Sequence, residues 1–335
     1  TIIKTDGTQN NQFDVPLTLL RMTEAHQQAV VELGTNHPGE IAYLASIVEP
    51  DVALVTNVGP EHLEFFGSLL EVLHEELSLL ESLSPQGTVI LPGDQLDVCL
   101  EAQRYLAPHV RVVTFGSTDR CDIQAQDIRR TEQGMVIRLR DHVGQWVVPM
   151  VGYHNVENAL AAIAAAWVAG VPLSVTRRRL ATFRPVPLRS ELLRCQGLTI
   201  LNDCYNANPL SFARALETLR DLSVRRKVAI VGDMLELGEF AASAHQAIGR
   251  LATQLGIDAV LAVGQYAGYV ADGVRETRPD AVTTYKTVPE LMERLPSFLQ
   301  DGDGLLVKGS RKLNLEQVTE FLIQRHPGAS RGVDQ

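Results

Sequence analysis

The sequence of 335 residues lacks the patterns that mark secreted, membrane-spanning or cysteine-ligated metal proteins. No apolar run reaches the about 18 residues that a membrane-spanning helix needs. The four cysteines show neither CxxC spacing nor another metal-ligand pattern, which indicates free thiols in a reducing compartment. Because no signal peptide is recognisable either, we expect a cytoplasmic protein.

Positive charge is also scarce in this chain. There are 30 Lys and Arg against 40 Asp and Glu, a formal net charge of -10. This balance argues against nucleic acid or an anionic membrane as the main partner. It does not exclude a phosphorylated substrate, because local basic groups and metal ions can hold one.

Length and composition indicate a globular protein of two domains. Hydrophobic residues make up 45% of the chain and charged residues 21%, which is ordinary for a protein with a sizeable core. The first residue is Thr1 rather than Met, and a strand-like apolar run follows at once. We therefore expect this sequence to continue a longer polypeptide.

The first half of the chain alternates short apolar runs with helical segments. The apolar runs are 29–33, 52–58, 88–92 and 110–115, and the helical segments are 39–48, 68–84 and 94–107. Buried strands that alternate with helices predict a doubly wound, mostly parallel α/β sheet. A period of two then replaces this pattern over 120–150, which predicts a small antiparallel patch.

A domain boundary is predicted at FRPVPLRSE (183–191), which contains two prolines. It divides the chain into 1–186 and 187–335. The second part again alternates strands and helices and is Rossmann-like in outline. It lacks a GxGxxG at a strand–helix junction, which argues against a dinucleotide-dependent oxidoreductase.

The segment GSLLEVLHEELSLLESL (67–83) predicts an amphipathic helix with a carboxylate on its apolar face. At about 100° per residue, Glu76 falls near the middle of the stripe that holds Leu73 and Leu80, while Glu75 lies off to one side. A buried carboxylate must be neutralised, paired or bound to a metal ion. The alternative is a helix end or site mouth where Glu76 reaches water.

Several polar groups follow predicted strands, where open α/β sheets place ligands. They are Asn10, Asn11, Glu32, Asn57 and His62. Together with Glu76, Glu32 and His62 offer oxygen and imidazole ligands that suit phosphate-bound Mg²⁺. Taken singly, Glu32 also fits a solvent-facing strand end, and His62 fits a loop histidine that caps the next helix.

A second polar set lies at the predicted boundary and at the strand end that follows it. Its members are Arg189, Asp203, Tyr205, Asn206 and Asn208. Arg189 suits phosphate through its planar fork, and Asp203 suits ribose hydroxyls. A structural Arg189–Asp203 ion pair is the alternative, and Asn208 with Pro209 also has the signature of a helix start.

Two further loops of the second part follow buried strands. Lys308, Ser310 and Arg311 come after the last strand and suit an anionic group such as a carboxylate. The acidic residues of GDMLELGE (232–239) either hold a cationic group or face water.

Taken together, an ordered series of motifs from Thr1 to about residue 325 resembles the Mur ligases. The motifs are TDGTQNNQFDVPLTLL, VVELGTNHPGEI, VTNVGPEHLEFFGS, HNVENALAA, RSELL, LNDCYNANP, AIVGDMLELGE and VKGSR. The resemblance implies an ATP-dependent amide-bond ligase of cytoplasmic peptidoglycan synthesis. ATP would phosphorylate the carboxylate of UDP-N-acetylmuramoyl-tripeptide, and D-alanyl-D-alanine would attack the resulting acyl phosphate. These two substrates, ATP and Mg²⁺ are the implied partners, and we expect a monomer.

The resemblance also implies roles for individual residues. Glu32 and His62 match Mg²⁺ ligands, and Glu76, His62 and Arg189 would carry catalysis. The residues implied near the nucleotide are Asn57, His154, Asn155, Asn158, Arg189 (γ-phosphate) and Asp203 (ribose). The residues implied at the other substrates are Asn10, Asn11, Tyr205, Asn206, Asn208, Lys308, Ser310 and Arg311, those from Tyr205 onward on a C-terminal domain that closes over the site.

The sequence also departs from the family pattern. A lysine that CO₂ carbamylates usually occupies the position of Glu76, whose carboxylate would serve Mg²⁺ directly. Thr8 and Asp14 stand where Asn and Gly are usual. The N-terminal UDP-binding domain and the Gly-rich phosphate loop would lie before Thr1, so we expect this chain alone to bind ATP poorly and to be inactive. A non-catalytic paralogue that binds a nucleotide-linked peptide is the alternative.

Overall fold

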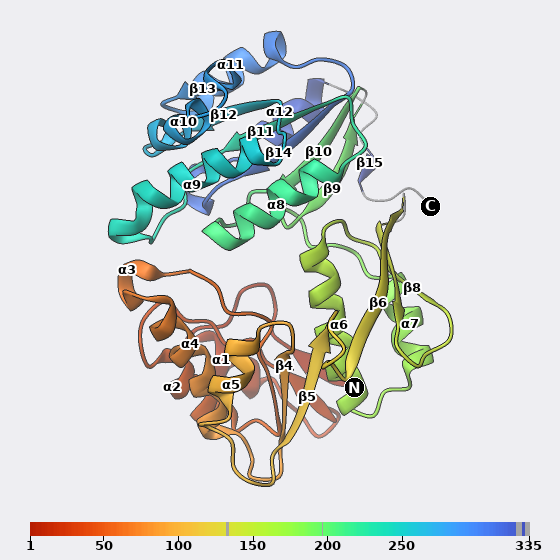
Figure 1. Cartoon of the computed structure of the whole chain (residues 1–335). Helices are drawn as coiled ribbons and strands as arrows, with labels where there is room; N and C mark the ends of the chain where they lie inside the picture. Colours follow the sequence, from red (N-terminus) through yellow and green to blue (C-terminus); the bar gives the residue numbers. More distant parts are fainter. Residues whose placement is uncertain (132–133, 196, 326–329, 332–335) are drawn as a thin grey trace. The chain divides into compact units, whose positions relative to one another are not determined.

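The computed structural model describes residues 1–131, 134–195, 197–325 and 330–331 (Figure 1). It forms two compact units, each of which is described by itself. The first unit comprises 1–125 and 160–173, and the second comprises 126–159 and 174–335. Within the described ranges, no helix is both long and apolar enough to cross a membrane.

The main sheet of the first half runs in the order β3-β4-β5-β6-β7-β8. Its strands are β3 (Val52–Leu54), β4 (Thr88–Pro92), β5 (Arg111–Gly116), β6 (Ile123–Thr131), β7 (Gly134–Leu139) and β8 (Gln145–Val148). Strands β3 to β6 pair in parallel, whereas β7 and β8 pair antiparallel. The predicted parallel sheet with a small antiparallel patch is therefore confirmed.

Helices connect and flank these strands. They are α2 (Glu40–Val48), α3 (Leu63–Phe66), α4 (Leu69–Leu77), α5 (Leu96–Ala102), α6 (Tyr153–Val168) and α7 (Leu173–Ala181). The centre of β4 is fully buried, since Val89, Ile90 and Leu91 are each 0% exposed. Cover on both faces is what a continuous apolar run in a parallel sheet requires.

The strand predicted over 29–33 differs from the prediction. Strand β2 (Gln28–Val30) pairs in parallel with β1 (Ile2–Lys4), and these two form a separate two-stranded sheet. All three β2 residues are exposed, with Val30 at 62%. Without an apolar layer on its faces, β2 is not the doubly covered strand that its composition suggests. Helix α1 (Asp14–Leu20) lies between β1 and β2 in the chain.

The second unit contains a sheet in the order β13-β12-β11-β14-β10-β9-β15. Its strands are β9 (Glu191–Cys195), β10 (Leu198–Asp203), β11 (Arg226–Val231), β12 (Ala259–Val263), β13 (Val282–Tyr285), β14 (Asp303–Lys308) and β15 (Ser330–Arg331). Strands β10 to β14 pair in parallel, while β9 pairs antiparallel with β10 and β15. Strand β9 begins at the end of the predicted boundary (183–191), where the sequence pattern predicted no strand.

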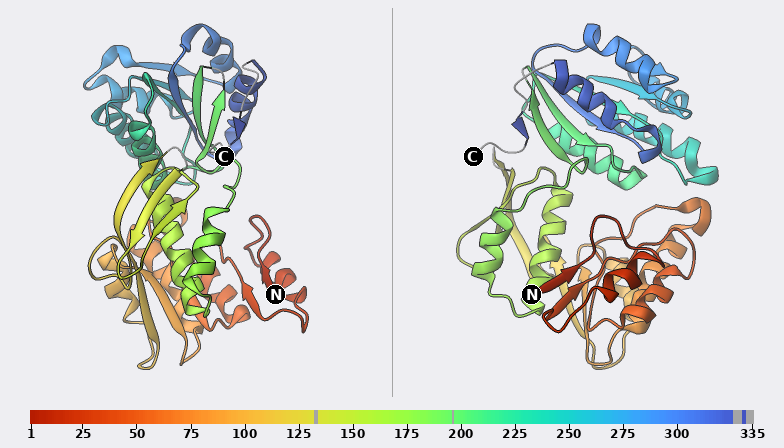
Figure 2. Two further views of the ribbon diagram at one scale, coloured as in Figure 1. Left: turned by 90° about the vertical axis from the view of Figure 1, so that its right-hand side faces the viewer. Right: turned by 180° about the vertical axis from the view of Figure 1, so that it is seen from behind.

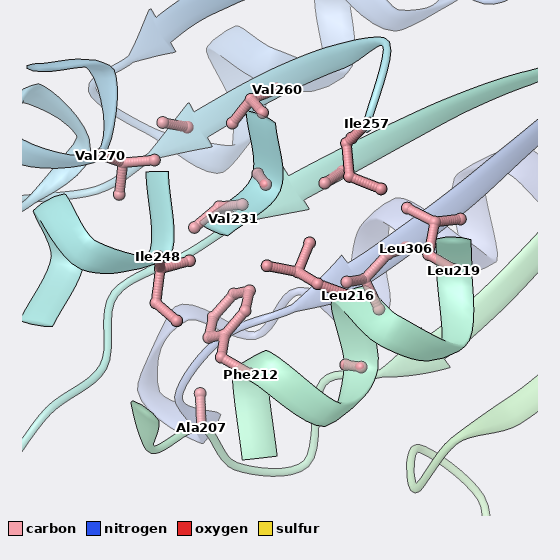
Figure 3. Close-up of a cluster of buried hydrophobic side chains, with 14 of the residues drawn as sticks. Ala207, Phe212, Leu216, Leu219, Val231, Ile248, Ile257, Val260, Val270 and Leu306 are labelled. Atoms are coloured by element: carbon pink, nitrogen blue, oxygen red, sulfur yellow. The ribbon is translucent and has the colours of Figure 1, made fainter. Parts of the chain in front are cut away.

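Helices cover both faces of this sheet (Figures 1 and 2). They are α8 (Pro209–Asp221), α9 (Ala241–Gln254), α10 (Ala267–Arg275), α11 (Val288–Phe298) and α12 (Glu316–Arg325). Successive residues of β11 alternate between two apolar clusters: Val231 packs with α8 and α9, whereas Ile230 packs with α11 and α12. Figure 3 shows the first cluster, with Phe212 and Leu216 of α8 beside Leu306.

Candidate active site

The fully satisfied buried carboxylate of α4 is Glu75, not Glu76. Glu75 is 7% exposed and accepts hydrogen bonds from the backbone N–H groups of Gly39 (2.7 Å) and Ile41 (2.8 Å). The hydroxyl of Thr35 donates a third, at 3.2 Å. These N–H groups lie at the start of α2, where the helix dipole favours an anion. The helical-wheel reading missed Glu75 because its partners come from another segment.

Glu76 lies in a different environment from its neighbour. Its side chain is partly buried, and burial together with the nearby charges of Glu61 and Glu75 raises its pKa to about 8. Part of the residue surface remains exposed, as the alternative of a site mouth requires. A carboxyl group held among like charges is stabilised when a cation joins it, so this surrounding fits a divalent metal ion.

Glu32 follows β2 of the two-stranded sheet, and His62 follows the loop between β3 and α3. Glu32 is exposed just after β2, and its Oε1 accepts a hydrogen bond from Nδ2 of Asn10 at 3.0 Å. His62 occupies the N-cap position of α3 with a left-handed backbone (φ 52°), although its side chain is not the cap. In the part of the chain that the structure describes, no three His, Cys, Asp or Glu side chains are grouped to hold a metal ion. The triad of Glu32, His62 and Glu76 is thus not preassembled and stays a prediction.

The asparagines of the first unit have different surroundings. The Asn11 Oδ1 accepts hydrogen bonds from the N–H groups of Phe13 (2.9 Å) and Asp14 (3.1 Å), so this side chain organises the start of α1. Asn10 orients Glu32, as described above. Asn57 is exposed in the loop between β3 and α3.

In the second unit, the central feature is a buried ion pair between Lys308 and Asp203. Lys308 is 2% exposed, and its Nζ lies 2.6 Å from the Oδ2 of Asp203. The same ammonium donates to the carbonyl oxygens of Asn206 (2.9 Å) and Asp203 (3.5 Å). Burial by itself raises the pKa of Asp203, but the charge and hydrogen bond of Lys308, with further help from Ser190 and His154, hold it below its usual value.

The second carboxylate oxygen of Asp203 holds Ser190. It accepts hydrogen bonds from the Ser190 N–H at 2.7 Å and from the Ser190 hydroxyl at 3.3 Å. The same hydroxyl lies 3.0 Å from Nε2 of His154. Burial lowers the pKa of His154, and its buried Nδ1 has no hydrogen-bond partner among the described residues. Sequence reasoning missed Ser190, which carries no signal of its own.

The alternative of a structural ion pair between Arg189 and Asp203 is wrong, because Lys308 occupies the Asp203 carboxylate. Arg189 is exposed instead, and its guanidinium carbon lies 4.2 Å from the centre of the Tyr205 ring. Stacking of this kind leaves the edge donors of the guanidinium directed away from the ring. Arg189 and Tyr205 are thus brought together, as the sequence suggested.

The remaining predicted residues lie at helix caps, in loops, on the surface and, for Asn155, inside helix α6. Asn208 caps α8 in a reciprocal box with Ser211, in which the two hydrogen bonds measure 2.7 Å and 3.0 Å. Ser310 is buried and accepts a hydrogen bond from the N–H of Leu235 at 3.0 Å. Arg311 pairs with Glu316. The other positions are Asn155, whose amide donates to the carbonyl of Val151, and Asn158 and Asn206, which are exposed.

The first acidic residue of the 232–239 loop has a structural role. Asp233 is buried and accepts hydrogen bonds from the N–H groups of Gln265 and Tyr266, both at 2.9 Å. It is directed at these backbone donors rather than at water, so the expectation that this residue faces water was wrong, and the binding of a cationic group by the loop stays a prediction. The carboxylate organises the turn that precedes α10.

Comparisons with known proteins agree with this architecture. The Mur ligase middle domain matches residues 1–166, and the "Mur ligase, glutamate ligase domain" matches residues 188–311. The UDP-N-acetylmuramoyl-tripeptide–D-alanyl-D-alanine ligase of Escherichia coli is 36% identical over 326 residues, which cover 95% of this chain and 70% of that protein.

Solved structures give the same result. MurF from Acinetobacter baumannii superposes with a TM-score of 0.86 at 29% identity, over 96% of this chain and 70% of that one. MurF from Thermotoga maritima, solved in complex with ADP, has a TM-score of 0.85 at 25% identity, over 97% of this chain and 73% of that one. Sequence motifs, domain matches and fold therefore agree, and the chain belongs to the Mur ligase family.

Proposed function

We propose that the protein is an ATP-dependent ligase that joins D-alanyl-D-alanine to UDP-N-acetylmuramoyl-tripeptide through an acyl phosphate. The similarity to the Escherichia coli ligase over 95% of the chain supports this reaction. It implies a cytoplasmic, monomeric enzyme of peptidoglycan precursor synthesis. We also keep the boundary between the two Mur ligase domains at residues 186 and 187.

One structural observation carries the proposal: the carboxyl group of Glu76 lies partly buried among other acidic groups. Burial and the charges of Glu61 and Glu75 disfavour a further negative charge on Glu76, so its carboxylate is stabilised by a cation. We assign Mg²⁺ to Glu76, Glu32 and His62, in place of a carbamylated lysine. When bound, Mg²⁺ supplies the positive charge that lets a phosphate and a carboxylate approach each other.

The second unit supplies the groups proposed to act on the nucleotide and the acceptor. Arg189 presents an exposed guanidinium, which suits the γ-phosphate of ATP. Arg311 keeps donors beyond the one that Glu316 occupies, and is half exposed, so we assign it to a carboxylate of the peptide substrates. His154 and Asn158 remain assigned to the nucleotide.

Phosphate release by the full-length protein tests the proposed reaction. The assay contains ATP, Mg²⁺ and UDP-N-acetylmuramoyl-tripeptide, with and without D-alanyl-D-alanine. We expect release that depends on the dipeptide. A folded protein that binds the UDP-peptide and releases no phosphate in response to the dipeptide is instead the non-catalytic paralogue, for which Glu76, Asp14 and Thr8 are the sequence arguments.

The metal assignment is tested by comparing two glutamates on the same helix. Glu76→Gln should raise the Mg²⁺ concentration needed for half-maximal rate about tenfold or more, because a charged ligand is replaced by a neutral amide. Glu71→Gln, at an exposed position of α4, is the control and should leave that concentration unchanged. Equal Mg²⁺ requirements for both variants and the parent would exclude Glu76 as a ligand.

A further inference from the structure

Lys308 was assigned to substrate binding from its place after the last strand, yet its surroundings give it another task. The three donors of its ammonium are directed at three acceptors within the protein: Asp203 Oδ2, Asp203 O and Asn206 O. Nζ also lies 5.7 Å from the centre of the Phe212 ring. A side chain 2% exposed and hydrogen-bonded in this way has little left to offer a substrate.

The segment that this ion pair holds is strained. Leu188 (φ 66°) and Ser190 (φ 47°) both have left-handed backbone conformations, which cost non-glycine residues about 1 kcal/mol or more each. Such residues persist only where the surroundings fix them. Here the Asp203 carboxylate accepts the Ser190 N–H, and the carbonyl of Leu188 accepts the N–H of Tyr205 at 3.1 Å.

Arg189 is the residue between these two strained positions. The turn directs its side chain outward over the Tyr205 ring, while its neighbours in the chain are tied to Asp203 and to Tyr205. Lys308 is 105 residues from Asp203 in the sequence, and its ammonium donates to Asp203 and Asn206 rather than to the turn at 188–190. Its connection to Arg189 runs through the Asp203 carboxylate.

We propose that Lys308 and Asp203 are positioning residues for Arg189. Their ion pair fixes the Asp203 carboxylate, the carboxylate fixes Ser190, and the left-handed turn then presents the Arg189 guanidinium in one orientation. This inference rests on the proposed function only in the role of Arg189 at the nucleotide phosphate. The positioning itself is a property of the protein without ligand and can be measured there.

The test follows the side-chain Nε–H resonance of Arg189 by NMR in the chain without nucleotide. The Tyr205 ring shifts this resonance, and Tyr205→Leu provides the unshifted reference. In Lys308→Met, the resonance should move most of the way to that reference, because an unpaired Asp203 carboxylate no longer holds Ser190. In Lys308→Met combined with Asp203→Asn, it should return toward the parent value, because a neutral amide keeps an oxygen for the Ser190 N–H without a buried charge.

The second readout uses the full-length enzyme. Lys308→Met should raise the KM for ATP about tenfold, with a smaller change in the KM for D-alanyl-D-alanine, and the double variant should recover part of this loss. A shifted Arg189 resonance with an unchanged KM for ATP supports the positioning and removes Arg189 from the nucleotide site. An unmoved resonance, or a selective rise in the KM for the dipeptide that the double variant shares, overturns the inference.

The matched control breaks a second ion pair to a buried carboxylate, at the opposite end of β14. Arg226 pairs with the buried Asp303 at 2.6 Å, at the start of β14, whereas Lys308 ends that strand. Arg226→Met therefore also leaves a buried carboxylate without its cation and should lower the free energy of unfolding. It should leave the Arg189 resonance in place, and a shift equal to that of Lys308→Met would show that both variants act through general loosening of the sheet.

Discussion

Glu76 in the first unit and Asp203 in the second are both acidic side chains taken largely out of water, but their surroundings are opposite. Burial and the charges of Glu61 and Glu75 raise the pKa of Glu76 to about 8. Asp203 is opposed by burial too, yet Lys308 and the donors around it keep its pKa below the usual value. The second unit thus contains the cation for its carboxylate, and the first unit does not provide one of comparable strength.

This difference separates two uses of a buried charge. The pair of Lys308 and Asp203 is complete without ligand, so it serves to fix backbone, and breaking it should cost stability. Glu76 is destabilised without a cation, so it is the better candidate for binding one. Glu75, one residue away, shows that position in a helix does not decide between these uses. Its two backbone donors do, because they compensate its charge.

We expect the largest loss of stability from removing Lys308, the cation that pairs with Asp203 in the second unit. Lys308→Met leaves the Asp203 carboxylate buried without its partner, which should lower the free energy of unfolding by about 3–5 kcal/mol. Urea denaturation followed by the fluorescence of Trp146, in a Trp167→Phe background, reports on this unit. Arg250→Met is the control, since its pair with Glu276 is exposed and should contribute at most about 1 kcal/mol. Equal losses in the two variants would contradict the distinction.

The second-largest effect is expected in the stability of the first unit, which should depend on pH in metal-free buffer. Glu76 has a folded-state pKa of about 8, above the ordinary value of 4.5. Between these values the unfolded chain loses a proton that the folded protein keeps, so stability should fall as pH rises. The ceiling is about 1.4 kcal/mol per pH unit, and partial exposure of Glu76 reduces the total to roughly 3 kcal/mol between pH 5 and pH 8.

Trp167 fluorescence, in a Trp146→Phe background, follows this unit during urea denaturation in EDTA. Glu76→Gln should flatten the pH profile, whereas Glu71→Gln should leave it as in the parent. A profile that stays equally steep in Glu76→Gln would show that another group causes it.

The third effect should have the opposite sign and belong to the second unit. His245 is fully buried, its Nε2 accepts the Met234 N–H at 2.8 Å, and its Nδ1 lies 2.6 Å from the carbonyl oxygen of Ala241. Burial lowers the pKa of this neutral imidazole. Because the unfolded chain takes up a proton below about pH 6.5 and the folded protein resists it, stability should fall as the pH drops below this value.

The acid-side loss is measured by the same Trp146 fluorescence. His245→Gln should lose stability at neutral pH but show a shallower decline toward pH 5. His142→Gln, at an exposed position of the same unit, should keep the decline of the parent. If His245→Gln declines as steeply as the parent, Asp203 and the other carboxyl groups account for the acid sensitivity instead.

Local patterns carried the parts of the fold that the sequence predicted correctly. The run 88–92 became β4 because its four apolar residues suit a strand covered on both faces, and Asn208 with Pro209 began α8 because cap and first-turn geometry are local. Strand β9 was overlooked because it lies beside two prolines that mark a boundary. Strand β9 is stabilised by antiparallel pairing with β10, and the local sequence pattern of 191–195 does not show this pairing.

The structure brings some of the predicted site residues together, and their functional roles stay predictions. Arg189 stacks on Tyr205, as the sequence suggested, and Lys308 pairs with Asp203, a partner that the sequence did not indicate. The partner of Asp203 is decided by contacts between segments that are distant in the sequence. The sequence therefore could not show that Lys308, rather than Arg189, pairs with Asp203. For the same reason the sequence could not show that Glu75 has backbone donors from residues 39 and 41.

The smallest effect concerns a residue to which both a cap and a substrate role have been assigned. Asn208→Ala removes the acceptor for the Ser211 N–H and should cost about 1 kcal/mol of stability. Asn208→Asp keeps a capping oxygen and adds a charge that the helix N-terminus favours, so its stability should match the parent. The comparable cap of the first unit is Ser68 on α4, and Ser68→Ala should cost a similar amount as a control.

If Asn208→Asp is stable but has a raised KM for D-alanyl-D-alanine, Asn208 also contacts the substrate. If the KM values of Asn208→Asp match those of the parent, Asn208 acts only as the cap of α8. It then belongs, like Lys308 and Asp203, to the groups of the second unit that are fully paired without ligand.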